Sequence, residues 1–182
     1  MAHIFIIHGV EGHPEENWLP WLRKEAEKLG HTVTVPHFPT PKNQTLAHWL
    51  SVIEEYSEFL TPATVLIGHS LGVPFILNIL EKYPAKAAVL VAGFVGKAGN
   101  HFDEGMATFA QKPFDWERIK NNCQNFTVFH SDNDPYIKPE KGREVAAQLG
   151  VELTLVKGAA HFNKAAGYET FDLLLKKIKP FL

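Results

Sequence analysis

Short apolar runs alternate along the chain with longer segments in which apolar residues recur every three or four positions. Six of the runs are candidate strands, at 4–7, 32–35, 63–67, 87–91, 126–129 and 152–156. Several of them are apolar almost throughout, which is typical of parallel strands covered on both faces of a sheet. The pattern therefore predicts a parallel sheet of about six strands.

The segments between these runs predict helices. Residues 15–29, 46–60, 71–83 and 139–149 are each long enough for three or four helical turns. In 71–83 Pro74 falls in the first turn, where its missing N–H is harmless. The apolar positions of this segment recur at helical spacing and are Leu71, Phe75, Ile76, Ile79, Leu80 and Tyr83.

Alternation of strands and helices predicts an α/β fold with a doubly wound sheet and helices on both faces, built from right-handed crossovers. Ligands of such folds bind at the carboxyl ends of the strands. One connection, residues 93–113, is rich in Gly and Phe and has no clear helical period. We expect it to be an irregular cover near the site. A chain of 182 residues is expected to form one domain, 1–182.

Composition argues against nucleic-acid-binding, disulfide-bonded and membrane-spanning proteins. The 18 Lys and Arg residues nearly balance 20 Asp and Glu residues and form no basic stripe, which argues against a nucleic-acid partner. Cys123 is the only cysteine, so no internal disulfide can form. No apolar run approaches the roughly 18 residues of a membrane span. The start, MAHIFIIHGV, lacks the features of a signal peptide, and we expect a cytoplasmic protein.

The stretch Gly68-His69-Ser70-Leu71-Gly72 joins a predicted strand to a predicted helix. A G-x-S-x-G motif in this position is typical of a nucleophile elbow, a tight turn that exposes a serine at the edge of the sheet. The flanking positions must be small because the turn brings them against neighbouring strands. Ser70 is therefore the candidate nucleophile. His69 is expected to orient the turn, since adjacent residues in such a bend point apart.

A serine hydroxyl needs a base and a carboxylate to become a good nucleophile. His161 follows the last predicted strand in a small-residue loop, and it is the candidate base. Two acids follow the fifth strand in the sequence FHSDNDPY. Asp134 precedes Pro135, which favours an extended conformation, whereas Asp132 lies closer to the strand and could cap a turn. Turn chemistry favours Asp134 as the third member, with Asp132 as the alternative.

A tetrahedral intermediate needs two N–H donors. We expect one from Leu71, the residue after the nucleophile, and the other from Val10, or else from Gly9, in the loop after the first strand. Phe94, Phe102 and Trp18 are candidates for a substrate pocket, because the first loop and residues 93–113 should meet above Ser70. The histidines show no paired metal-ligand spacing, so no metal or other cofactor is predicted.

These residues resemble the small α/β-hydrolases of the YdeN and retinoblastoma-binding-protein-nine type. The likeness covers nearly the whole chain: a His-Gly loop after the first strand, Trp18 and Trp21, IGHSLG, KPFDWERIKNNC, SDNDPY and the late HF. It implies an α/β-hydrolase fold with minimal or no lid, and Ser70, Asp134 and His161 as nucleophile, acid and base. The chain lacks a Leu-x-Cys-x-Glu stretch, so the retinoblastoma-binding motif is not carried over.

The sequence thus predicts a carboxylesterase-like serine hydrolase that cleaves small ester or amide substrates through an acyl-enzyme. With so short a segment over the site, small acyl groups are favoured over long-chain lipids. The alternative is a non-catalytic protein-interaction module on a hydrolase scaffold. We expect a monomer or a weak homodimer, with no nucleic-acid or membrane partner.

Overall fold

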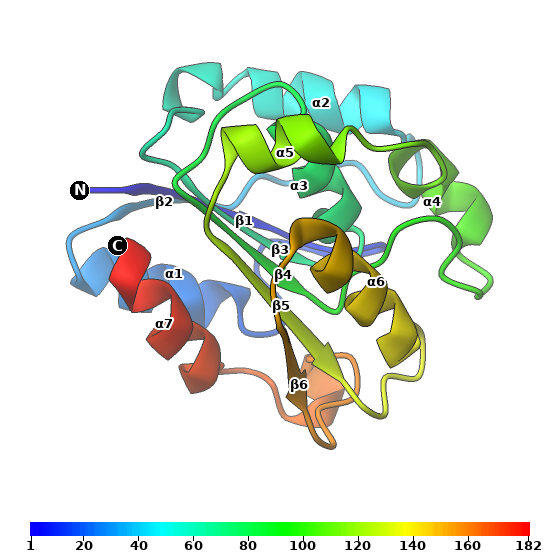
Figure 1. Ribbon diagram of the computed structural model, residues 1–182. Helices are drawn as coiled ribbons and strands as arrows, with labels where there is room; N and C mark the ends of the chain where they lie inside the picture. Colours follow the sequence, from blue (N-terminus) through cyan, green and yellow to red (C-terminus); the bar gives the residue numbers. More distant parts are fainter.

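The computed structural model describes all of residues 1–182 and contains one sheet of six parallel strands (Figure 1). The strand order is β2-β1-β3-β4-β5-β6, so the chain starts next to the edge strand β2 and, after β2, continues on the other side of β1. The bounds are β1 His3–Ile7, β2 Thr32–Thr34, β3 Val65–His69, β4 Ala87–Val91, β5 Phe126–Ser131 and β6 Leu153–Val156. The predicted doubly wound parallel sheet is confirmed.

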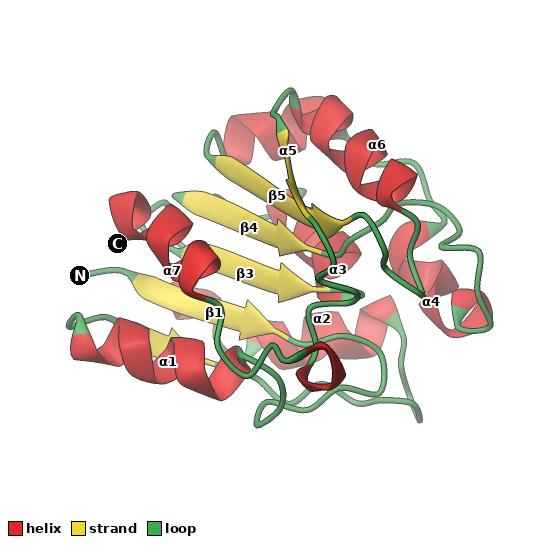
Figure 2. Ribbon diagram, turned by 90° about the horizontal axis from the view of Figure 1, so that it is seen from below, coloured by secondary structure: helices red, strands yellow, loops and turns green.

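Helices cover both faces of this sheet (Figures 1 and 2). Helices α1 (Leu19–Lys28) and α7 (Asp172–Ile178) lie on one face. The other face carries α2 (Leu46–Glu54), α3 (Gly72–Leu80), α5 (Trp116–Asn122) and α6 (Pro139–Leu149), with α4 (Asp103–Ala110) near the strands' carboxyl ends. Short 3-10 turns occupy Ser57–Phe59, Lys164–Ala166 and Lys179–Phe181.

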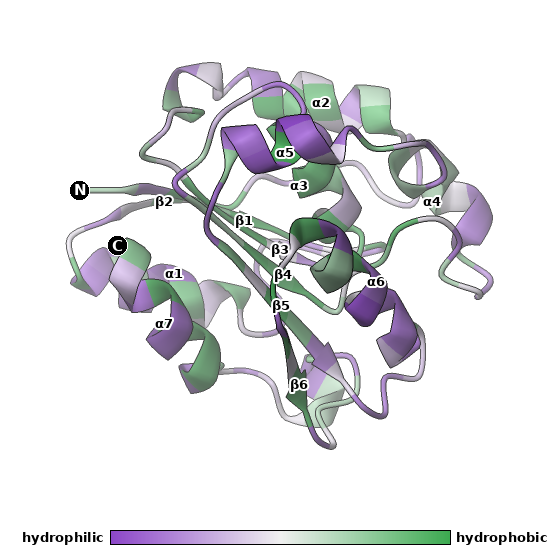
Figure 3. Ribbon diagram, in the orientation of Figure 1, coloured by the Kyte–Doolittle hydropathy of each residue, from purple (hydrophilic) through white to green (hydrophobic).

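The central strands have side chains in both hydrophobic layers, as expected for a sheet buried on both sides. Phe5 and Ile7 of β1 belong to the cluster under α2 and α3. Ile4 and Ile6 belong to the cluster under α1 and α7. All four are fully buried, and the hydropathy colouring shows the strands as predominantly apolar (Figure 3). The sheet is thus a rigid base from whose carboxyl edge the loops project.

Several helix bounds differ from expectation: the helix predicted at 15–29 begins at Leu19, the one predicted at 46–60 ends at Glu54, and a further difference lies between β4 and β5. Residues 93–113 are not irregular throughout, because Asp103–Ala110 form α4. The Asp103 carboxylate accepts hydrogen bonds from the N–H groups of Ala98 and Gly99, which closes the preceding loop onto the helix. Phe102, Met106 and Phe109 recur at helical spacing, and this spacing is the sequence signal for α4.

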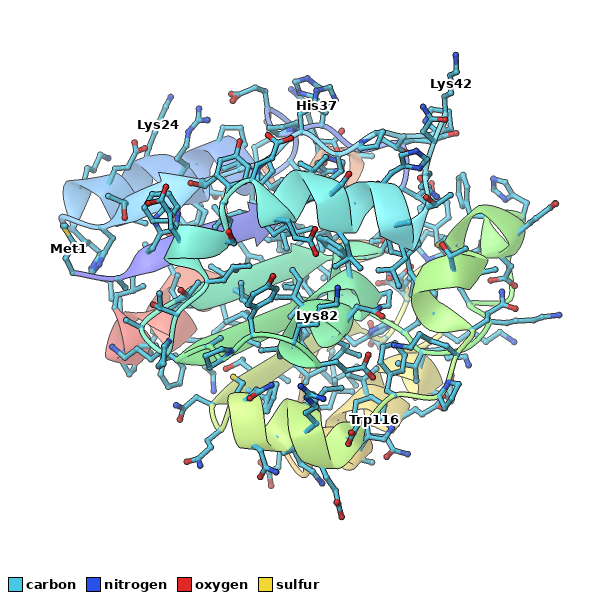
Figure 4. All side chains as sticks on the ribbon, turned by 90° about the horizontal axis from the view of Figure 1, so that it is seen from above. Met1, Lys24, His37, Lys42, Lys82 and Trp116 are labelled. Atoms are coloured by element: carbon cyan, nitrogen blue, oxygen red, sulfur yellow. The ribbon has the colours of Figure 1, made fainter.

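Polar side chains dominate the outside of the molecule. Figure 4 shows Lys24 and Lys42 extending away from the body of the protein, and both residues are exposed. Trp116, also labelled there, is partly buried and packs against the core beneath α5. None of the helices has both the length and the apolar character needed to cross a bilayer.

Candidate active site

Ser70 lies in a sharp turn between β3 and α3. Its φ angle is 56°, a left-handed conformation that is unfavourable for a residue with a side chain. Its N–H donates to the carbonyl of Val91 at the end of β4, 2.9 Å away. This hydrogen bond fixes the turn to the neighbouring strand, and the backbone geometry is that expected of a nucleophile elbow.

The two flanking glycines are required by close contacts. A Cβ atom at Gly68 would lie 2.7 Å from the carbonyl oxygen of Gly72, and one at Gly72 would lie 2.6 Å from that of Ile7. Both obstacles are backbone atoms, which cannot move aside cheaply. The expectation that positions 68 and 72 must be small is therefore confirmed.

The loop after β1 lies directly against the serine. A Cβ atom at Gly9 would be 2.9 Å from Cβ of Ser70 and 3.3 Å from its Oγ. Val10 lines the same cavity as Ser70, and Leu71 follows Ser70 in the chain. The N–H groups of Val10 and Leu71 donate no hydrogen bond within the protein. Both are therefore free to bind an oxyanion.

His161 and Asp134 form a direct hydrogen bond. Nδ1 of His161 lies 2.7 Å from Oδ2 of Asp134, whose side chain is fully buried. The other carboxylate oxygen accepts from the N–H groups of Tyr136 and Ile137 at 2.9 and 3.0 Å. Burial acts to raise the pKa of Asp134, but the hydrogen bonds from His161 and these N–H groups outweigh it and lower the pKa. Asp134 thus stays ionised opposite the imidazole.

Asp132, the alternative acid, has a different partner. Its Oδ1 accepts from the N–H of Gly158 at 2.8 Å, and Oδ1 of Asn133 accepts from the N–H of Ala160 at the same distance. Three consecutive side chains after β5 therefore each bind a successive part of the loop that carries His161. Asp132 and Asn133 hold the backbone of this loop, and only Asp134 contacts the imidazole.

Two aromatic side chains hold the His161 loop from the other side. Nε2 of His69 lies 2.7 Å from the carbonyl oxygen of His161, and Nε1 of Trp18 donates to the carbonyl of Phe162 at 3.0 Å. Burial lowers the pKa of His69 to about 3, so its ring is neutral and Nε2–H is the donor. The side chain of His69 therefore holds the loop that carries His161.

A cavity of about 240 Å³ lies above the serine. Neither Ser70 Oγ nor His161 Nε2 has a hydrogen-bond partner, and neither is among the solvent-inaccessible polar atoms, so both reach this open space. The structure contains no direct hydrogen bond between them, and in unliganded enzymes such contacts are often long. The lining comes from loops at the carboxyl ends of the strands and from α4, and it includes Val10, Glu16, Ser70, Met106, Tyr136 and His161.

Only one of the three residues predicted to form the substrate pocket lines the cavity. Phe102 lines the cavity as expected. Phe94 and Trp18 do not: Phe94 is fully buried in the core under α3, and Trp18 is fully buried with its indole against the His161 loop. Met106 and Tyr136 also line the cavity and were not predicted. Met106 lies in α4, which was not predicted either, and the Tyr136 ring packs edge-on to His161 at 5.0 Å between centroids.

The chain matches a known protein family over most of its length. A sequence model of the family described as serine hydrolase matches residues 4–179. The chain belongs to the serine hydrolase family. Within this serine hydrolase family, the chain is 27% identical over 175 residues to YdeN of Bacillus subtilis (strain 168), covering 94% of the chain and 91% of YdeN.

A second relative is the serine hydrolase RBBP9 of Rattus norvegicus, 26% identical over 166 residues, covering 91% of the chain and 88% of that protein. The crystal structure of the B. subtilis ydeN gene product superposes with a TM-score of 0.92 at 25% identity, covering 100% of this chain and 98% of that one. The resemblance predicted from the motifs is confirmed, and so is the α/β-hydrolase fold. This serine hydrolase family member has no group of three or more His, Cys, Asp or Glu side chains placed to hold a metal ion.

Proposed function

We propose that this serine hydrolase cleaves small ester or amide substrates through an acyl-enzyme, with Ser70 as nucleophile, His161 as base and Asp134 as the acid that orients the base. The observation that carries the proposal is the 2.7 Å hydrogen bond from His161 Nδ1 to Asp134, with Nε2 left open to the cavity that contains Ser70 Oγ. The buried carboxylate keeps the proton on Nδ1, so Nε2 is the basic nitrogen.

The reaction then proceeds in two halves. Nε2 of His161 takes the proton of Ser70 as Oγ attacks the substrate carbonyl, and the carbonyl oxygen gains negative charge. The free N–H groups of Leu71 and Val10 bind this oxygen, with Gly9 as the alternative donor in the first loop. His161 passes its proton to the leaving alcohol or amine. Water activated by His161 then attacks the acyl-enzyme and releases the acid.

Cavity size supports a small substrate. About 240 Å³ is below the usual range for drug-sized ligands, roughly 300–1,000 Å³. Phe102 and Met106 supply an apolar wall from α4 and the residue before it, while Glu16 and Asn17 supply polar groups from the first loop. A short acyl group fits this volume better than a long lipid chain.

Labelling of the serine tests the proposal. A fluorophosphonate probe and a panel of short p-nitrophenyl esters are applied to the wild-type protein, to Ser70→Ala and to the control Ser51→Ala, an exposed serine on α2. We expect labelling and ester turnover in the wild type and in the control, and neither in Ser70→Ala. Labelling that persists in Ser70→Ala would remove the assignment. A folded wild type with neither activity would favour the interaction module.

A further inference from the structure

One buried histidine takes no part in the proposed chemistry. His130 lies in β5, four residues before Asp134, and its side chain is fully buried. Its Nδ1 is the single buried side-chain nitrogen or oxygen atom without a hydrogen-bond partner in the protein. An unpaired buried polar atom is costly, whereas an apolar side chain of similar size would avoid the cost. Packing alone therefore does not account for a histidine at this position.

The other ring nitrogen makes one specific contact. Nε2 of His130 lies 2.9 Å from the carbonyl oxygen of Ile137. A carbonyl can only accept, so Nε2 carries the proton and Nδ1 is the unprotonated nitrogen. Burial, the largest influence, lowers the pKa of His130, in agreement with a neutral ring. Nδ1 faces Gly142 of α6, where a Cβ atom would lie only 2.7 Å away.

Ile137 connects His130 to the candidate acid. Its N–H donates to Oδ1 of Asp134 at 3.0 Å, while its carbonyl accepts from His130. Both backbone groups of Ile137 are therefore hydrogen-bonded, and these two bonds fix the turn formed by residues 134–137. His130 Nε2 lies 4.0 Å from Oδ2 of Asp134, too far for a hydrogen bond, so that oxygen remains free for His161.

We propose that His130 is a positioning residue: its Nε2–H holds the Ile137 carbonyl so that the turn 134–137 presents Oδ2 of Asp134 to His161. The role requires a donor at the Nε2 position and no charge. The inference rests on the proposed function of Ser70, Asp134 and His161, and it adds a residue outside the cavity that acts through the acid. Gly142 then provides the space that the ring needs.

Two substitutions of similar shape separate the donor from the volume. His130→Gln keeps an N–H donor close to the Nε2 position, and His130→Met has nearly the same length but no donor. We expect His130→Gln to stay near the wild-type kcat. His130→Met should lower kcat about 10-fold or more, since small displacements of catalytic groups have effects of this size. KM should change less than kcat in both, because neither side chain touches the cavity and His130 reaches its wall only through Tyr136 and Ile137.

A proton NMR measurement tests the hydrogen bond between His161 and Asp134 directly, independently of differences in stability between the variants. The hydrogen-bonded Nδ1–H proton of His161 should give a downfield proton resonance, identified by its absence in His161→Gln. We expect the resonance in the wild type and in His130→Gln, and its loss or broadening in His130→Met. Rates are normalised to the folded fraction from melting curves. If His130→Met does not fold, His130→Asn, whose amide is too short to reach Ile137, replaces it.

The outcomes separate the two proposals. Equal kcat and an intact resonance in His130→Gln and His130→Met would overturn the positioning role and leave the proposed function standing. Failure of the wild type to react with the probe would overturn the proposed function. The resonance would still report whether His130 orders the pair of Asp134 and His161, because it is recorded without substrate.

Discussion

At the scale of single residues, the candidate site depends on which atom each side chain can reach. Ser70 occupies a strained backbone conformation, and Ala160 and Phe162, on either side of His161, also have positive φ angles of 44° and 51°. Strain at such positions persists only where surrounding contacts hold it. For the His161 loop these contacts are the hydrogen bonds from Trp18 and His69 and to Asn133.

Substitution of the two neighbouring acids should have unequal effects. In Asp134→Asn the amide can still accept from the backbone of Tyr136 and Ile137, but its NH₂ group would face His161 and favour the wrong tautomer. On the proposed function we expect kcat to fall about 10⁴-fold, the size of the effect that this substitution has in Ser-His-Asp hydrolases. Asp132→Asn keeps an oxygen for Gly158 and should change kcat only a few-fold. Ester hydrolysis at matched protein concentration measures both, and the reverse ranking would exchange the roles of the acids.

At the scale of elements, α4 is held to α3 by one buried amide. Nδ2 of Asn78 donates to the carbonyl of Phe109 at 2.9 Å, and its Oδ1 accepts from Lys112 at 2.9 Å. The Phe109 carbonyl has no helical partner because the residue four positions on is Pro113, which lacks an N–H. Asn78 therefore closes the end of α4, and α4 in turn carries Met106 into the cavity wall.

Removal of this amide should loosen α4. In Asn78→Leu the Phe109 carbonyl loses its side-chain partner, and the Lys112 ammonium keeps only Glu81. We expect the free energy of unfolding to fall by about 1–3 kcal/mol. Hydrogen exchange of the amides in 103–110 should rise more than that of the sheet. Gln111→Ala, which removes an exposed hydrogen bond to Asp103, is the control and should have little effect. Equal exchange in the two variants would contradict the role of Asn78.

At the scale of the whole molecule, buried neutral histidines tie stability to pH, and His8 and His69 have the largest shifts in pKa. Burial lowers the pKa of His8 to about 4 and that of His69 to about 3. Nε2 of His8 accepts from the N–H of Phe38, so protonation would break this hydrogen bond. Between pH 6.5 and 4 the unfolded chain binds protons at both positions and the folded protein does not. Its free energy of unfolding therefore decreases as the pH falls through this range.

Urea denaturation at a series of pH values measures this dependence. We expect the highest midpoint above about pH 7 and a steady fall from pH 6.5 to pH 4. In His8→Gln the free energy of unfolding should fall less steeply with decreasing pH. The slope should be smaller by up to about 1.4 kcal/mol per pH unit, which corresponds to one proton. The exposed His101→Gln is the control and should follow the wild type. A midpoint constant from pH 7.5 to 4.5 would show that these rings are not kept neutral by the fold.

Much of the architecture follows from local sequence patterns. Apolar runs indicated all six strands, with bounds that differ by up to two residues, and 139–149 matches α6. The motif around Ser70 indicated the turn, because its glycines and its place between strand and helix are local features. Helices α4, α5 and α7 were missed, since they are short and most of their stability comes from packing against the sheet.

The sequence by itself determined the doubly wound sheet, the elbow and the order of Ser, Asp and His, because hydrophobic period and turn chemistry act over a few residues. Only the tertiary structure decided which acid meets the imidazole, that Trp18 supports the His161 loop instead of lining the cavity, and that Phe94 is core. Those outcomes depend on hydrogen bonds between residues far apart in the chain, such as Asp134 with His161 and Trp18 with Phe162. Side-chain direction at such sites is set when the loops meet at the sheet edge. The turn before Pro135 favoured Asp134, but only the folded loops place its carboxylate against the imidazole of His161.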